Sequence, residues 1–110
     1  MSQDVAADVR RVVEAYQASR RTAERRERGR TDLVLPVEVR TESGQTFTLM
    51  SRDVSDAGIR LVGTRRLLGQ RVTVRVPLGA GHVEFTVRIL WACPIGDDLV
   101  ENGGTFLPTD

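Results

Sequence analysis

Residues 83–91 have the clearest strand pattern of the chain and read Val83-Glu84-Phe85-Thr86-Val87-Arg88-Ile89-Leu90-Trp91. Apolar residues at the odd positions alternate with mostly polar residues at the even ones, which is the period of a half-buried strand. We therefore expect the odd-numbered side chains, Trp91 included, to share one face that points into a core.

The same alternation recurs on both sides of this segment, and glycines or prolines separate the repeats. Five further strands are predicted, over residues 33–39, 47–53, 59–61, 72–76 and 99–106. Pro36 lies within the first of them and indicates a strand edge or the outer side of a bend. Six short alternating strands favour an all-β fold in which a closed barrel or sandwich leaves few exposed edges.

The first 20 residues follow a different period. Val5, Val9, Val12 and Tyr16 recur at helical spacing, so residues 1–20 are predicted to form an amphipathic helix. Ser2 is suited to cap this helix, and Asp4 suits its positive end. The apolar stripe is too narrow to form a core alone. We expect it to pack on the barrel, and packing on another chain stays open.

Residues 21–32 are predicted to form a basic connector between the helix and the barrel domain, residues 33–110. Positions 20–30 hold six arginines against two glutamates, although the net charge of the 110-residue chain is only +1. Such a dense cationic segment predicts an anionic partner. All sixteen basic residues are Arg, whose planar guanidinium pairs with phosphate and stacks on bases.

Common catalytic and metal-binding patterns are absent from the sequence. The single histidine, His82, and the single cysteine, Cys93, have no third ligand at a recognisable spacing, so neither an enzyme nor a metal site is predicted. Cys93 is expected to be a buried free thiol. No apolar run reaches the roughly 20 residues that span a membrane, and a cytoplasmic location is expected.

Two short motifs remain, and both their residues and their order along the chain are informative. Residues 25–30, Arg25-Arg26-Glu27-Arg28-Gly29-Arg30, contain R-x-x-x-R, and residues 53–58, Asp53-Val54-Ser55-Asp56-Ala57-Gly58, contain D-x-S-x-x-G. Together with the strand pattern and the closing Gly103-Gly104-Thr105-Phe106, they make the chain resemble the PilZ domain family over about residues 24–108. The resemblance implies a six-stranded antiparallel β-barrel that binds cyclic di-GMP without changing it chemically, and no cofactor.

The resemblance also implies which residues hold the ligand: Arg25, Arg26, Arg30, Asp53, Ser55 and Gly58. Their chemistry agrees, because a guanidinium can donate two hydrogen bonds to guanine O6 and N7 or bind a phosphate. Asp53 would accept hydrogen bonds from guanine N1–H and the N2 amine, Ser55 offers a hydroxyl, and Gly58 permits a backbone conformation or a close approach that a side chain would block.

Arg25 stands immediately before R-x-x-x-R, and family members with this extra Arg tend to bind two stacked ligands. Two molecules of cyclic di-GMP per chain are therefore expected. We expect the ligand to clamp the connector onto the barrel, to move the helix and so to signal to an effector protein that the sequence does not identify.

Two other functions stay open at this stage. The chain could be a PilZ-fold adaptor that recognises a protein without ligand, although it retains both motifs. It could also be an Arg-rich nucleic-acid-binding module. Against the latter, Phe47, Phe85 and Trp91 all fall at expected core positions, which would leave no surface for stacking bases.

Overall fold

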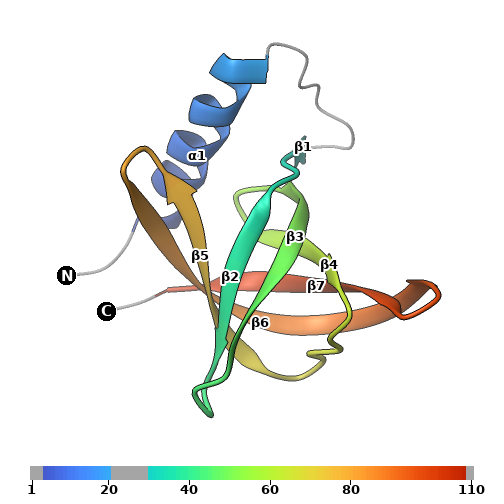
Figure 1. Ribbon diagram of the computed structural model, residues 1–110. Coiled ribbons are helices and arrows are strands. Elements are labelled where there is room, and N and C mark those ends of the chain that lie inside the picture. Colours follow the sequence, from blue (N-terminus) through green and yellow to red (C-terminus); the bar gives the residue numbers. More distant parts are fainter. Residues whose placement is uncertain (1–3, 21–29, 109–110) are drawn as a thin grey trace.

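The computed structural model describes residues 4–20 and 30–108, which form one helix and seven strands. The helix α1 spans Val5–Arg20 (Figure 1). The strands are β1 (Thr31–Asp32), β2 (Pro36–Thr41), β3 (Thr46–Val54), β4 (Gly58–Gly63), β5 (Arg71–Leu78), β6 (Gly81–Gly96) and β7 (Leu99–Leu107).

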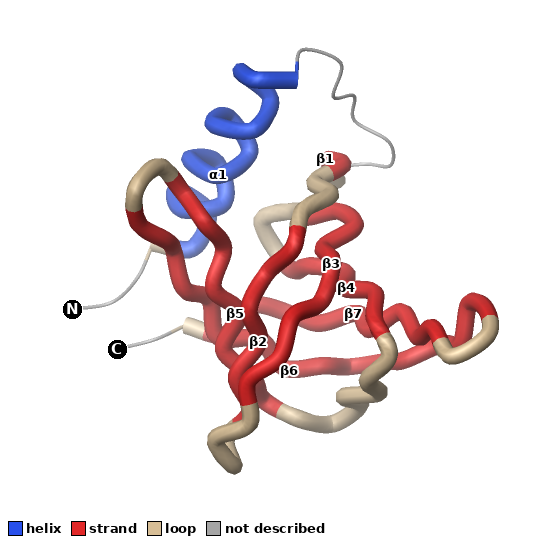
Figure 2. The backbone as a smooth tube through the Cα atoms, in the orientation of Figure 1, coloured by secondary structure: helices blue, strands red, loops and turns tan. Residues whose placement is uncertain are grey.

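Strands β2 to β7 form a closed antiparallel barrel, as the sequence predicts. The strand order is β1-β3-β2-β5-β6-β7-β4, and an additional pairing of β3 with β4 closes the ring. The short strand β1 lies outside the ring and pairs with the end of β3. Figure 2 shows the strands wrapping around a common interior, with α1 at one end of the barrel.

Alternation along the strands places one set of side chains inside the barrel. The interior is rich in β-branched residues, which suit a pleated strand, and includes Val37, Val39, Ile59, Leu61, Val72, Val74, Val76, Val87 and Ile89. The partly buried Phe106 packs against the buried Phe85, with ring centroids 4.9 Å apart. The period-2 pattern of the sequence therefore separates the side chains that point into the barrel from those that point outward.

The first predicted strand is interrupted, which matters for the site. Instead of one strand over 33–39, β1 and β2 are separated by residues 33–35, and Pro36, which lacks an N–H, begins β2. The buried Ser51 hydroxyl donates to the carbonyl of Leu33 and accepts from the N–H of Leu35. β1, which lies in the range assigned to the connector, thereby stays paired with β3 and brings residue 30 beside its end.

Trp91 is not a core residue, which corrects the prediction from alternation. A register shift between Ile89 and Trp91 lets two residues of β6 oppose one of β7. Such a bulge reverses the inward and outward faces beyond it. Ile89 is buried, whereas Trp91 is 40% exposed on the outer surface. Cys93, further along the same strand, is an exposed free thiol and not a buried one.

The helix α1 packs against β5 and β6 through its apolar stripe, as expected. Val9 and Val12 are buried in the same cluster as the barrel core, and Val5 and Val13 pack against it. Asp4 caps the helix, because its carboxylate accepts from the N–H of Ala7 at 3.1 Å. Within the part of the chain that the structure describes, no helix is long and apolar enough to cross a membrane.

Candidate functional site

The turn between β3 and β4 is held by one hydroxyl. The Ser55 Oγ accepts hydrogen bonds from the backbone N–H of Ala57 at 3.1 Å and of Gly58 at 3.2 Å. The Ser55 N–H also donates to the Gly58 carbonyl at 2.9 Å. Short polar side chains favour such turns because they bond their own backbone. Ser55 therefore fixes the turn that follows Asp53.

This turn is also fastened to the last strand of the barrel. The carbonyl of Ala57 accepts from the Phe106 N–H at 2.9 Å and from the Thr105 hydroxyl at 3.1 Å. Gly58 pairs with Thr105, and a Cβ at Gly58 would overlap the carbonyl oxygen of Gly104. Its φ is not positive, so glycine is required here for close approach of two strands and not for an unusual backbone conformation.

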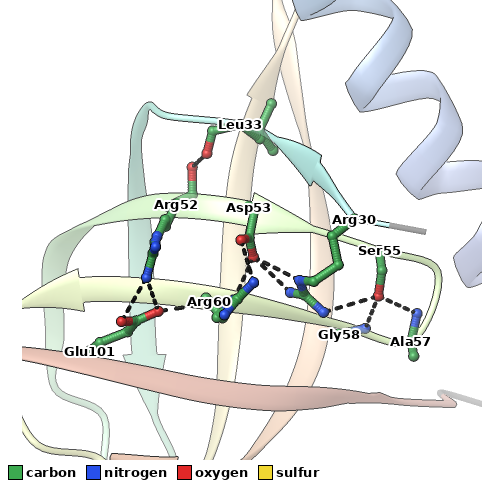
Figure 3. Close-up of polar contacts among 10 residues, drawn as sticks. Arg30, Leu33, Arg52, Asp53, Ser55, Ala57, Gly58, Arg60 and Glu101 are labelled. Carbon is green, nitrogen blue, oxygen red and sulfur yellow. Dashed lines mark hydrogen bonds and ion pairs between the residues drawn. The ribbon is translucent and has the colours of Figure 1, made fainter. Parts of the chain in front are cut away.

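Arg30 reaches this turn from just before β1. Its Nε donates to Asp53 Oδ1 at 2.9 Å, and its Nη2 lies 2.8 Å from the same oxygen (Figure 3). Its Nη1 lies 3.4 Å from the Ser55 hydroxyl. The two motifs are thus in direct contact, although 23 residues separate Arg30 from Asp53.

Three residues that the sequence analysis did not single out complete a cluster of charges. Arg60 on β4 donates its Nε to Asp53 Oδ1 at 2.8 Å and places its Nη2 2.7 Å from Oδ2. Arg60 also lies 3.9 Å from Glu101, to which Arg52 donates at 2.7 and 2.8 Å. Only the outward position of Arg60, between the inward Ile59 and Leu61, could be expected from the sequence.

Both acids of the cluster are buried, and the arginines determine the ionisation of Asp53. Asp53 is 4% exposed and Glu101 is 5% exposed. Burial alone would raise the pKa of Asp53, but the hydrogen bonds and positive charges of Arg60 and Arg30 outweigh it and hold the pKa below its ordinary value of 3.8. Asp53 is therefore an ionised acceptor at neutral pH.

One row of the barrel surface connects this cluster to Trp91. In the strand register Asp53 lies opposite Arg60, Arg60 opposite Gly103, and Gly103 opposite Trp91. Residues directly opposite in an antiparallel pair project from the same face. A Cβ at Gly103 would overlap the Trp91 ring, so the indole lies against the Gly103 backbone. The row thus carries a carboxylate, a guanidinium and a partly exposed aromatic ring.

The structure brings together four of the six residues predicted for the site: Arg30, Asp53, Ser55 and Gly58. Arg25 and Arg26 lie outside the described residues. Nothing in the described ranges resembles a metal centre, because they contain no group of three His, Cys, Asp or Glu that could hold an ion. The described residues of the site offer hydrogen-bonding groups, paired charges and the partly exposed Trp91 ring.

Comparison with protein families matches residues 19–109 to the PilZ domain. Among solved structures, the Bacillus subtilis inhibitor of motility MotI/DgrA is similar with a TM-score of 0.51 and 21% identity, over 76% of this chain and 43% of that chain. MrkH of K. pneumonia in its apo state has a TM-score of 0.50 and 15% identity, over 79% and 42% respectively. The chain matches less than half the length of these proteins. No curated protein matches it.

Proposed function

Because the chain belongs to the PilZ domain family, a family of cyclic di-GMP receptors, we propose that it binds cyclic di-GMP on the outer face of the barrel beside the β3–β4 turn. PilZ domains are binding domains and not enzymes, so the ligand leaves unchanged. The observation that carries the proposal is the direct contact of Arg30 with Asp53 and Ser55, which joins both motifs at one site.

Asp53 supplies the acceptor for the guanine edge. Asp53 is buried and ionised, and it lies on β3 just before the turn that the Ser55 hydroxyl and the last strand hold in place. The N1–H and N2 amine of guanine are donors, and a carboxylate accepts two parallel hydrogen bonds from such a pair. A guanidinium beside the neighbouring Hoogsteen edge of the base can donate to O6 and N7, as in the recognition of guanine in DNA. Arg30 is the described residue placed for that role.

The phosphates need further positive charge. Among the described residues of the cluster, Arg30, Arg52 and Arg60 already face Asp53 and Glu101. A ligand with two phosphates adds two negative charges, which are unfavourable at a site that is nearly neutral. Arg25 and Arg26 of the connector are proposed to supply the cations, and Arg25 to allow a second, stacked ligand.

Trp91 is proposed to stack on a base at the far end of the row. Stacking on an aromatic side chain contributes about 1–3 kcal/mol per base. The indole is 40% exposed and is separated from Arg60 only by the bare backbone of Gly103. The exposed Trp91 also removes part of the argument against nucleic-acid binding, so single-stranded DNA belongs among the controls.

Ligand binding is proposed to change how the chain contacts a partner protein. Ligand binding would fasten the connector, residues 21–32, against the barrel and shift α1, which the connector follows directly in the sequence. A partner protein would then recognise the altered helix surface. The helix has a small buried contact with β5 and β6, which is consistent with an element that can be displaced.

Trp91 is the only tryptophan, and its fluorescence tests the proposal directly. Cyclic di-GMP should change the emission of the wild-type protein saturably, whereas GTP, cyclic AMP and single-stranded DNA should not. Asp53→Ala should abolish the change. Asp56→Ala is the matched control, because Asp56 is an exposed acid of the same turn. If the folded wild type gives no response and no ligand is retained on dialysis, the proposal is wrong.

A further inference from the structure

Asp53 is shared unequally by its two arginines. Arg60 forms a bidentate pair, with Nε on Oδ1 and Nη2 on Oδ2 at 2.8 and 2.7 Å. Arg30 directs both its Nε and its Nη2 at Oδ1 alone (Figure 3). Bidentate pairing adds both energy and geometric specificity. Of the two contacts, that of Arg30 is the easier one to release.

The acceptor capacity of the carboxylate defines what a guanine could use. Two carboxylate oxygens offer about four lone-pair sites. Arg60 occupies one on each oxygen, and among the described residues Arg30 takes the remaining capacity of Oδ1. A guanine that donates N1–H to one oxygen and its N2 amine to the other therefore competes with Arg30 but not with Arg60.

We propose that Arg60 is a permanent positioning residue for Asp53, and that Arg30 is exchanged: the guanine of the ligand takes its place on Asp53 while Arg30 turns to acceptors of the ligand. This inference rests on the proposed function and specifies how its site is regulated. Without ligand, Arg30 occupies the Asp53 carboxylate and so blocks the acceptor that guanine would use. With ligand, the same guanidinium becomes part of the binding surface.

Burial explains why the exchange requires Arg60. Asp53 is 4% exposed, and removing the only partner of a buried charge is strongly destabilising. Arg60 keeps the carboxylate compensated while Arg30 moves. Arg60 is itself held between two carboxylates, since Glu101 lies 3.9 Å away and is bound by Arg52. Asp32 on β1 lies opposite Asp53 and is the remaining charged neighbour in the strand register.

The first test needs no ligand. The carboxyl pKa of Asp53 is measured by carbon NMR in the full chain, in the wild type, in Arg30→Gln and in Arg60→Gln. The pKa should rise in both variants and rise more in Arg60→Gln, because the bidentate partner is lost. An equal rise, or a larger one in Arg30→Gln, would overturn the assignment of Arg60 as the dominant partner.

The second test follows the two guanidinium Nε–H resonances of the wild type during a cyclic di-GMP titration. The Arg30 resonance should shift as the guanidinium leaves Asp53, whereas the Arg60 resonance should keep the chemical shift that it has without ligand. Movement of both, or of Arg60 alone, contradicts the exchange. If no ligand binds at all, the proposed function fails, while the carboxyl titration still decides the role of Arg60.

Affinity provides the third readout. Arg60→Gln should weaken cyclic di-GMP binding by about tenfold or more, the effect of losing one charge-assisted interaction. Arg71→Gln is the matched control, since Arg71 on β5 pairs with the exposed Glu42 and not with any residue of the charge cluster, and it should bind within about twofold of the wild type. If Arg60→Gln does not fold, Arg60→Lys keeps the charge without the fork and should still weaken binding. Wild-type affinity in a folded Arg60 variant would overturn the inference.

Discussion

Asp53 and Gly58 begin and end the same motif, and the structure gives each a separate physical reason. Asp53 is a buried carboxylate whose pairs with Arg30 and Arg60 hold it ionised. Gly58 leaves room for the backbone of β7, to which the turn is fastened. From the sequence, Asp53 could be predicted as a hydrogen-bond acceptor, and a close approach was one of the two reasons predicted for Gly58. The second partner of Asp53 could not, because Arg60 acts through the register of β3 with β4.

Gly58→Ala should destabilise the barrel and impair the site together. The added methyl group would overlap the Gly104 carbonyl, and overpacking of this kind costs about 1–3 kcal/mol. Urea unfolding measures the loss in the free energy of unfolding. Gly81→Ala is the control, because a Cβ there meets nothing within 4 Å, and it should change stability far less. Equal effects of the two substitutions would contradict this reading of Gly58.

Asp53→Asn should show when the carboxylate stabilises the fold. The pKa of Asp53 in the folded protein lies below its ordinary value of 3.8. A group with a lowered folded pKa stabilises at pH values above its unfolded pKa, and the stabilisation is lost as the pH falls through the folded pKa. The wild type should therefore exceed the variant in stability by about 1–3 kcal/mol at neutral pH.

This difference should stay constant down to about pH 5 and shrink once the pH falls below 3.8. Urea unfolding of both proteins across that range measures it. A gap that is unchanged, or that widens on acidification, would show that the arginine pairs do not stabilise the ionised form of Asp53 in the folded state.

Single elements explain where sequence reasoning succeeded and where it failed. The strands were predictable because half-burial is local: each inward residue alternates with an outward one whatever its partner strand. The face of Trp91 was not, because the bulge after Ile89 depends on how β6 pairs with β7. Leu90 and Trp91 are both apolar, so the sequence carries no sign of where the alternation reverses. The break at residues 33–35 likewise depends on Ser51 of the neighbouring strand.

The helix α1 lies next to the site at its first turn as well as being joined to it by the connector. Asp4 and Val5 line a groove of about 590 Å³ together with Asp56, Ala57 and Phe106. Asp56 and Ala57 belong to the turn that Ser55 and Arg30 hold. A ligand that rearranges this turn therefore has a short structural route to α1.

Cyclic di-GMP should accordingly alter hydrogen exchange in the N-terminal part of the chain. Exchange in residues 21–31 should slow on binding, because the ligand orders the arginines that contact it, and exchange in α1 should change with it. The Asp53→Ala protein with the same ligand concentration is the control and should show no change. Unchanged exchange throughout residues 1–31 of a ligand-saturated wild type would contradict the clamping mechanism.

At the scale of the whole molecule, closure of the barrel assembles the site. Arg30 precedes β1, Asp53 lies one residue before the end of β3, Arg60 lies on β4 and Glu101 on β7. These residues meet because β3 pairs with both β1 and β4, and β4 with β7. The alternation of the sequence predicts the six strands of the barrel but neither the short β1 nor the register of the strands. The pairing of the two motifs was predicted only through the resemblance to PilZ domains, and that resemblance gave no role in the site to Arg60, Glu101 or Trp91.

Cyclic di-GMP binding by the wild-type chain is the central prediction of the receptor function. Calorimetric titration of cyclic di-GMP into the wild type should give a dissociation constant of about 1 μM or lower, and a stoichiometry of two ligands per chain if Arg25 supports a second one. Arg30→Ala and Asp53→Ala should lose the heat of binding while remaining folded by circular dichroism. No binding by the folded wild type would contradict the receptor function and leave a PilZ barrel that recognises its partner without cyclic di-GMP.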